Sequence, residues 1–483
     1  MFAQKRSAVE QFVSSPFMQG ASVSFMVTEA GRDSALYSYD ADREVIPASV
    51  MKTVTTATAL ELLGADYRYS TEISYDGVIQ DSVLHGNIFI CGSGDPSLGS
   101  AELKDPVRDA VFREWVSAVK NVGIKAVTGA VIADESVFDT EGVSMKWLRE
   151  DLGSYYGQGC YGINVFDNSF SLFINTERNK PVIERTEPSM PDMRFHNYLK
   201  TGGKDSCYIV GHPYSSERWL YGVVPAGRAA YRLDGDIPDP PLYSAWLLNE
   251  MLSLSGISVT GKPSCYRILK EDSAGYQYEE QNNFADSSIS VPPHSVFNDD
   301  TSRKVLITTY SRPLKDLIRI TNNVSSNLYA DAFLKTIGLR CTESVSSFEK
   351  GAYILHKHWN DKGFDTSPLW MSDGSGLAPT DKLSARFLCR VLSYMATKSP
   401  NSKDFIQSLP RVGEEGTVRN FLKGSALQGK ARLKSGSMSR VRSYAGYVEK
   451  DGKMYVVAVI INNFHCSQSA MRLEIEKLLK NLF

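Results

Sequence analysis

Both ends of this 483-residue chain combine β-prone runs with helical segments, and a long middle stretch differs from both in composition. Residues 21–28 and 35–39 have the β-prone composition of a pair of strands joined by a turn. Residues 445–461 indicate a β-hairpin around Asp451-Gly452, and an amphipathic helix follows it. We therefore predict one domain that is assembled from both ends of the chain and interrupted in sequence by a large insertion.

The middle stretch is rich in Gly, Pro, Asn and short β-prone runs, such as residues 86–90 and 129–133. We predict one helix there, over residues 244–254, and a polar linker over residues 272–293. The predicted division is a discontinuous catalytic domain, residues 1–66 plus 292–483, and an inserted region, residues 67–291.

Bulk composition narrows the classes of function. The chain is 42% hydrophobic with a net charge of -2, which disfavours nucleic acid or a polybasic membrane role. No run approaches the roughly 18 apolar residues that a membrane span needs.

The seven cysteines show no C-x-x-C spacing, so we interpret them mainly as buried small hydrophobes, with at least one unpaired. His356-x-His358 has the spacing of one strand face but lacks a third ligand, and we predict no metal and no cofactor.

Three short motifs carry the chemistry, in the order Ser49-x-x-Lys52, Ser325-x-Asn327 and Lys434-Ser435-Gly436. Ser49 and Lys52 lie three residues apart at the start of a predicted helix, residues 49–63, so they share one face. A serine hydroxyl is a weak nucleophile without a base nearby, and lysine acts as a base only when its pKa is lowered. Lys434 would lower it as a second cation.

Each motif taken alone is weak evidence for an active site. The S-x-x-K pattern recurs at Ser117–Lys120 and Ser347–Lys350, which we interpret as solvated helix positions. Only Ser49 follows a predicted hairpin and a Pro-Ala entry, and only Ser49 has the partner motifs in order.

The second motif lies between two helices predicted within residues 312–337, the latter ending at Gly338. This position turns both side chains toward a cleft. Ser325 would relay a proton to a leaving amine, and Asn327 would hold a substrate amide.

The third motif precedes the terminal hairpin. Gly436 allows a ligand to approach the strand backbone closely. Ser435 and Ser437 offer hydroxyls to a carboxylate, and Lys434 supplies charge.

With these residues in place, the chain resembles the low-molecular-mass class C penicillin-binding proteins, the D-alanyl-D-alanine carboxypeptidase/endopeptidases of the penicillin-binding protein 4 type. The resemblance spans nearly the whole chain in family order, through residues 46–52, 92–98, 151–157, 239–243, 373–377 and 413–417.

The resemblance implies an α/β (α+β) fold with a transpeptidase/β-lactamase-like domain, in which helices flank a mainly antiparallel sheet. The β-rich insertion would form two small domains. Ser49 would be the acylated nucleophile, Lys52 the base and Lys434 the residue that completes the cleft, while Ser325 and Asn327 would shape the leaving-group side. Backbone N–H groups of Ser49 and Ser437 would form the oxyanion hole.

The partners implied are peptidoglycan peptides and β-lactam antibiotics, and no nucleic acid. The implied location is the periplasm or cell envelope, with a signal peptide absent from this chain. Carboxypeptidase and endopeptidase activity both stay open, as does the oligomeric state.

Two departures from the family pattern bear on substrate binding. Ser435 stands where the family usually has Thr, which predicts altered affinity and retained function. Asp151 is a candidate, by its position in the insertion, to meet the free amine of a diaminopimelate stem peptide, although a role in capping a turn explains it equally well.

Two other functions fit parts of the pattern. A β-lactamase would use the same motifs with a deacylating carboxylate, but a compact lactamase has no use for the large insertion. A catalytically weak cell-wall binding scaffold would keep the fold, yet all the nucleophile-side residues are intact.

Overall fold

The computed structural model describes residues 2–105, 107–177, 180–273 and 303–483. Residue contacts divide the chain into two compact units. The first comprises residues 1–67, 144–148 and 312–483, and the second comprises residues 68–143 and 149–311.

The boundary predicted between residues 291 and 292 lies outside the described residues, as does most of the predicted linker. Strand β19 (Lys304–Tyr310), which the prediction assigned to the catalytic domain, belongs to the second unit. It pairs antiparallel with β3 (Ser70–Tyr75), because its backbone groups complete the edge of the sheet that contains β3.

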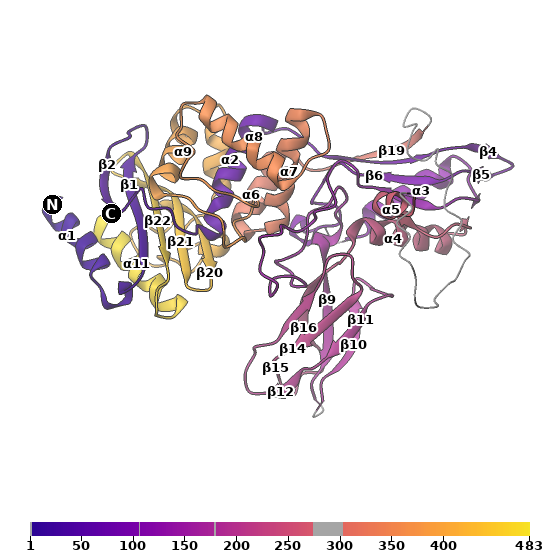
Figure 1. The fold of residues 1–483 in the computed structure, drawn as a ribbon, viewed down its shortest axis with the longest axis horizontal. Coiled ribbons are helices and arrows are strands. Elements are labelled where there is room, and N and C mark those ends of the chain that lie inside the picture. Colours follow the sequence, from indigo (N-terminus) through magenta and orange to yellow (C-terminus); the bar gives the residue numbers. More distant parts are fainter. Residues whose placement is uncertain (1, 106, 178–179, 274–302) are drawn as a thin grey trace. The chain divides into compact units, whose positions relative to one another are not determined.

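The first unit is built on one antiparallel sheet, which joins the two ends of the chain (Figure 1). Phe25 near the N-terminus lies opposite Val459 near the C-terminus in this sheet. The predicted fold class, a mainly antiparallel sheet flanked by helices, is confirmed. The strands in spatial order are β2 (Ala35–Tyr39), β1 (Ser22–Glu29), β22 (Lys453–Asn462), β21 (Val441–Lys450) and β20 (Ala431–Met438).

Helices cover both faces of this sheet, because side chains alternate along each strand. Val457 and Val459 belong to one apolar cluster with helices α1 (Phe2–Val13) and α11 (Gln468–Leu482). Helix α9 (Ala385–Thr397) packs on β22, β1 and β21. Around the central helix α2 pack the helices α6 (Leu314–Val324), α7 (Asn327–Thr342), α8 (Phe348–Asp361) and α10 (Ser402–Ser408).

Helix α2 (Met51–Leu63) is the central helix of the first unit. Its first ten residues are buried, which agrees with its Ala-, Thr- and Leu-rich sequence. It ends at Leu63 and is followed by Gly64, whose φ of 85° and ψ of 154° form a backbone conformation that favours glycine. The Ser49-x-x-Lys52 motif is therefore anchored at the start of a fully packed helix.

The described residues of the second unit form five sheets. One apolar cluster includes Trp115 of helix α3 (Ala110–Asn121), Leu172 of strand β9 (Ser169–Asn175) and Leu248 of helix α4 (Pro240–Leu254). Because these elements share one core, residue contacts group the insertion as one unit, whereas the sequence predicts two small domains. The sheets are β18 (Ser264–Cys265), β8 (Val131–Asp134), β6 (Ile88–Cys91), β3 and β19; β17 (Ser258–Val259), β7 (Ala126–Val127), β5 (Val83–His85) and β4 (Val78–Gln80); β10 (Val182–Glu187), β9 and β16 (Tyr231–Asp236); β11 (Arg194–Asn197), β14 (Glu217–Tyr221) and β13 (Tyr208–Gly211); and β12 (Lys200–Gly202) with β15 (Val223–Pro225).

Several local predictions need correction. Helix α4 begins at Pro240 and not at residue 244, since Asp239 caps it and the two prolines fit its first turn. Helix α7 continues past Gly338 to Thr342, and this glycine is a packing position, where a Cβ would lie 2.2 Å from Ser346 Oγ. The pair His356 and His358 lies on helix α8 and not on a strand.

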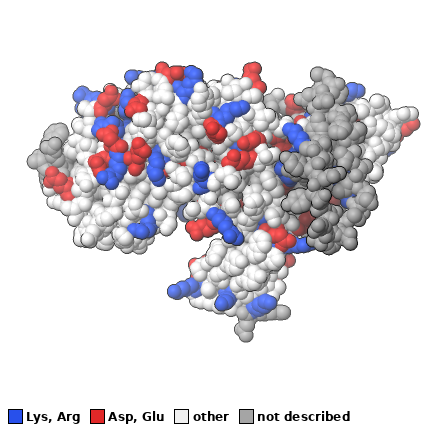
Figure 2. All heavy atoms as spheres, viewed as in Figure 1, with Lys and Arg blue, Asp and Glu red and all other residues white. Residues whose placement is uncertain are grey.

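The cysteines are all free thiols, and their burial varies more than predicted. Cys160, Cys265 and Cys389 are buried, Cys341 is exposed, and the other three are half-buried. None of the helices among the described residues combines the length and apolar character of a membrane span. On the face shown in Figure 2, basic and acidic side chains are interspersed over the described surface, in keeping with a net charge near zero.

Candidate active site

Ser49 lies in a single 3-10 turn (Ala48–Val50) that leads into helix α2. Strands β21 and β22 hold the approach to this turn. The Asn462 side chain accepts a hydrogen bond from Ile46 N (2.7 Å) and donates one to Ile46 O (2.9 Å), and Ser443 Oγ donates to Pro47 O (2.6 Å). Ala48 has a φ of 49°, a left-handed conformation that costs energy for a residue other than glycine. Contacts from the two neighbouring strands thus fix the backbone that leads into Ser49.

Lys52 follows Ser49 by one helical turn and is fully buried. Its Nζ donates hydrogen bonds to Ser49 Oγ (3.0 Å), Asn327 Oδ1 (2.6 Å) and the Ser375 carbonyl (2.7 Å). Burial lowers the pKa of Lys52 to about 8, although the nearby carboxylates of Asp331 and Asp373 raise it. An amine with such a pKa is partly neutral near physiological pH and can accept the proton of the Ser49 hydroxyl.

Two buried carboxyl groups, Asp331 and Asp373, lie behind Lys52. Asp373 opens the stretch 373–377 that resembles the family, but neither residue is among the predicted site residues. Asp373 accepts hydrogen bonds from the backbone of Ser375, Gly376 and Ala378 and from the indole of Trp147, at 2.6–3.0 Å. Four N–H donors stabilise a charged carboxylate. Asp373 thereby fixes the loop that presents the Ser375 carbonyl to Lys52.

Asp331, on helix α7, accepts a hydrogen bond from Gly374 N (2.8 Å). Burial and repulsion from Asp373 raise the pKa of Asp331 well above its ordinary value. Protonation of Asp331 is therefore favoured over its ordinary behaviour, since two buried carboxyl groups so close do not both ionise readily. The signal for Asp331 is visible in the sequence, where an acid interrupts the apolar run of residues 328–337.

Ser325 and Asn327 meet Lys52 and Lys434 from the junction of helices α6 and α7. Ser325 ends α6 in the left-handed conformation, with a φ of 64°, and the Ser326 side chain caps the first turn of α7. This sharp junction brings the Ser325 hydroxyl to Lys434 Nζ (2.8 Å) and the Asn327 amide oxygen to Lys52 Nζ (2.6 Å). The structure therefore brings together five predicted residues: Ser49, Lys52, Ser325, Asn327 and Lys434.

Strand β20 carries the third motif along this junction. Lys434 is fully buried and donates to Ser325 and to the Ser435 carbonyl (2.7 Å). Burial, together with the charge of Lys52, lowers the pKa of Lys434 well below its ordinary value. Two cations thus repel each other across the site, and this repulsion favours a neutral lysine or a bound anion.

The other positions of the third motif fit a cleft along the strand. A Cβ on Gly436 would lie 2.3 Å from Ser443 Oγ and 2.9 Å from Ser49 N, so only glycine allows this approach. Ser435 Oγ donates to Thr417 Oγ1 (2.7 Å), which the sequence analysis did not predict as a site residue. Ser437 is exposed on the same face of the strand as Ser435.

The remaining candidates lie elsewhere. Ser117 and Lys120 are exposed on helix α3, as predicted. Ser347 is a half-buried residue that caps helix α8, so the third S-x-x-K match has a structural role. Asp151 belongs to the second unit, where its carbonyl closes a turn by accepting from Ser154 Oγ (2.6 Å). The described residues contain no group of three or more His, Cys, Asp or Glu side chains placed to hold a metal ion.

Comparison with known proteins gives one consistent result. The sequence matches the profile of the D-Ala-D-Ala carboxypeptidase 3 (S13) family over residues 5–267 and 281–482. A D-alanyl-D-alanine carboxypeptidase of Actinomadura sp. (strain R39) is 25% identical over 492 residues, which cover 97% of this chain and 82% of the relative. The crystal structure of penicillin binding protein 4 (dacB) from Haemophilus influenzae covers 98% of each chain, with a TM-score of 0.79 and 19% identity. The same protein complexed with a β-lactam covers 99% of this chain and 98% of its own, with a TM-score of 0.74 and 18% identity.

Proposed function

The chain belongs to the D-Ala-D-Ala carboxypeptidase 3 (S13) family, and we propose that Ser49 is the nucleophile with which it cleaves peptidoglycan stem peptides. It is a serine-type D-Ala-D-Ala peptidase, and two of its relatives are named D-alanyl-D-alanine carboxypeptidases. One observation carries the assignment of Ser49: its hydroxyl lies 3.0 Å from the amine of Lys52, a buried lysine whose pKa is lowered to about 8.

The reaction begins when neutral Lys52 takes the proton of Ser49 Oγ, and Oγ attacks the carbonyl carbon of the penultimate D-Ala. The negative charge on the carbonyl oxygen is stabilised by the backbone N–H groups of Ser49 and Ser437. The proposal that these two N–H groups act together is supported by the close approach of strand β20 to Ser49, where a Cβ on Gly436 would lie 2.9 Å from Ser49 N.

The C–N bond then breaks. The proton that Lys52 took from Ser49 passes through the Ser325 hydroxyl to the leaving amine, so Lys52 is neutral again. Lys434 Nζ holds this hydroxyl in place by donating a hydrogen bond to it at 2.8 Å. Water attacks the resulting ester with Lys52 again as the base, which releases the shortened peptide and restores Ser49. The substrate carboxylate next to the cleaved bond binds at Ser435, Ser437 and Lys434, and its charge favours the protonated form of Lys434.

β-Lactams place a strained amide in the position of the scissile bond, so they acylate Ser49. The β-lactam complex of the Haemophilus influenzae protein supports this extension to the present chain. Because peptidoglycan lies outside the cytoplasm, we place the activity in the cell envelope. Asp151 stays a candidate contact for the free amine of the stem peptide.

Intact-mass spectrometry after incubation with penicillin tests the proposal. We expect a single adduct that is absent from Ser49→Ala and retained in Ser117→Ala, which removes the serine of an unrelated S-x-x-K match. Loss of the antibiotic without an adduct would indicate a β-lactamase. An adduct that persists in Ser49→Ala would disprove the assignment.

A further inference from the structure

A basic pocket opens beside the candidate active site, within the first unit. It has a volume of about 380 Å³ and lies between the end of helix α6, the loop of residues 416–421, strand β21 and helix α11. Three of its lining residues are arginines, Arg419, Arg442 and Arg472, and no acidic residue lines it. A pocket of this charge selects an anion.

The three guanidinium groups differ in the partners that each already has within the protein. Arg472 has Glu476 at 3.6 Å, and Arg442 is held by the hydroxyl of Tyr444, at 3.0 Å from Nε. Arg419 is exposed, and its side chain makes no ion pair or hydrogen bond with the described residues. Two positive charges of the pocket thus have no acidic partner among the described residues. One is Arg442, which Tyr444 positions, and the other is the exposed Arg419.

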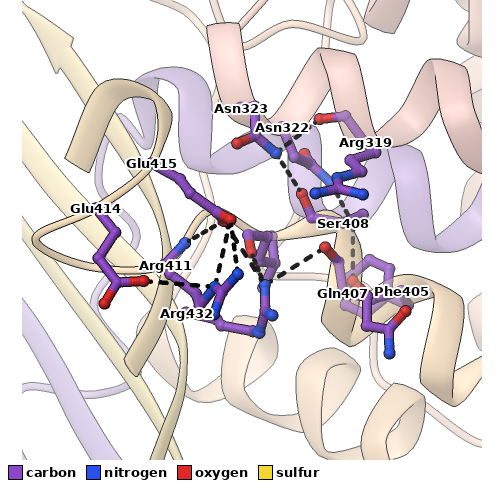
Figure 3. Close-up of polar contacts among 11 residues, drawn as sticks. Arg319, Asn322, Asn323, Phe405, Gln407, Ser408, Arg411, Glu414, Glu415 and Arg432 are labelled. Carbon is purple, nitrogen blue, oxygen red and sulfur yellow. Dashed lines mark hydrogen bonds and ion pairs between the residues drawn. The ribbon is translucent and has the colours of Figure 1, made fainter. Parts of the chain in front are cut away.

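Neighbouring ion pairs hold the pocket loop in place without using these charges (Figure 3). The Glu415 carboxylate accepts a hydrogen bond from Arg411 N (2.9 Å) and lies 3.9 Å from Arg432. The Asn323 side chain donates to Ser408 O (3.1 Å), and its own carbonyl abuts Gly416. The loop that carries Thr417 and Arg419 is therefore anchored at its base.

The pocket lies next to the place where the substrate carboxylate is expected to bind. Thr417 lines the pocket and accepts the hydrogen bond of Ser435. Val324 lines it and directly precedes Ser325. Arg442 lies directly opposite Ser437 in the strand pair, so the two side chains share one face of the sheet.

We propose that this pocket, lined by Arg419, Arg442 and Arg472, is a second anion subsite that binds a further carboxylate on the leaving strand of a cross-linked peptide. The proposal rests on the proposed function. A carboxypeptidase reaction releases one amino acid, whose single carboxylate binds at Ser435 and Ser437. Cleavage of a cross-link releases a whole peptide with additional carboxylates, and the nearest of these extends past Ser435 and Thr417 into the basic pocket. The subsite therefore favours endopeptidase over carboxypeptidase cleavage.

The test compares kcat/KM for a cross-linked muropeptide dimer and for a single-stem pentapeptide in Arg419→Gln, Arg419→Glu and the wild-type enzyme. Arg419 is exposed, so neither variant disturbs the core. We expect Arg419→Gln to lower kcat/KM for the dimer by about tenfold, the ratio that one charge-assisted hydrogen bond supplies, with a larger loss for Arg419→Glu. Cleavage of the pentapeptide should change by less than about twofold, and added salt should weaken dimer cleavage more than pentapeptide cleavage.

Lys423→Gln is the matched control, because it removes an exposed positive charge from the same segment without lining the pocket. Equal effects of Arg419→Glu on both substrates, no effect on either, or the same effect in Lys423→Gln would overturn the subsite. Failure of the proposed function differs from these outcomes, since wild-type enzyme would then cleave neither peptide and form no β-lactam adduct at Ser49.

Discussion

Lys52 and Lys434 are both fully buried, but the regions that bury them differ in charge. Behind Lys52 lie Asp331 and Asp373, which raise its pKa against the effect of burial and leave it at about 8. At Lys434 the charge of Lys52 acts in the same direction as burial, and no carboxylate of the described residues counters it. These surroundings fit the two proposed roles, in which Lys52 is the base and Lys434 binds the substrate carboxylate.

The largest expected effect separates these two roles. Lys52→Met keeps the unbranched stem and removes the amine, so we expect acylation by penicillin to slow by about a thousandfold, the scale of losing a general base. Lys434→Met should slow it by about a hundredfold, since it removes electrostatic stabilisation and a proton-relay contact. The measurement is the second-order acylation rate. A greater loss in Lys434→Met than in Lys52→Met would reverse the assignment of the base.

The next effect is the pH dependence of the wild-type enzyme. The active form of Lys52 is the neutral amine, whose fraction falls about tenfold per pH unit below the pKa. With a pKa of about 8, acylation should rise with pH through that value and be about a hundredfold slower at pH 6 than at its plateau. A rate that is flat from pH 6 to 9 would show that Lys52 is not the titrating base.

Removing the charge behind Lys52 should shift this profile. Asp373→Asn deletes the carboxylate that raises the pKa of Lys52, so the midpoint should move below pH 8. The asparagine NH₂ also faces backbone donors that now point at the carboxylate, and we expect the plateau rate to fall by about tenfold. Trp147→Phe is the matched control, because it removes one of the four donors and keeps the charge. A midpoint that moves upward in Asp373→Asn would contradict this electrostatic assignment.

The sequence predicted the sheet well because its information is local and periodic. Strand β22 alternates between two apolar faces, so residues 454–461 were predicted as a strand of the terminal hairpin. The β-prone composition of both chain ends predicted that they share one domain, and the pairing of β1 with β22 is a contact that only the structure shows. Strand β19 was assigned to the wrong side of the boundary, since its partner β3 lies more than two hundred residues earlier and nothing within residues 304–310 indicates it.

At the site, the three motifs predicted the side chains proposed to react, but not the carboxyl groups of Asp331 and Asp373 that act on the pKa of Lys52. Asp373 acts through four N–H donors, and three of them are backbone groups whose directions no side-chain pattern encodes. The fourth donor, Trp147, lies within the stretch predicted as the insertion but belongs to the first unit. Asp331 could have been found, because a buried acid in an apolar helix needs a partner.

The smallest expected effect concerns Ser435, where the family resemblance predicts a threonine. Ser435 is almost fully buried, and its hydroxyl is bound to Thr417, which lies in the region of Lys434 and not in that of Lys52. Ser435→Thr keeps this hydroxyl and adds one methyl group in a confined space, so we expect KM for a pentapeptide to change by less than about threefold. The pH midpoint should stay at its wild-type value, because the carboxylates that tune Lys52 are untouched. A shift of that midpoint in Ser435→Thr would show that the two regions are coupled more tightly than their separate surroundings suggest.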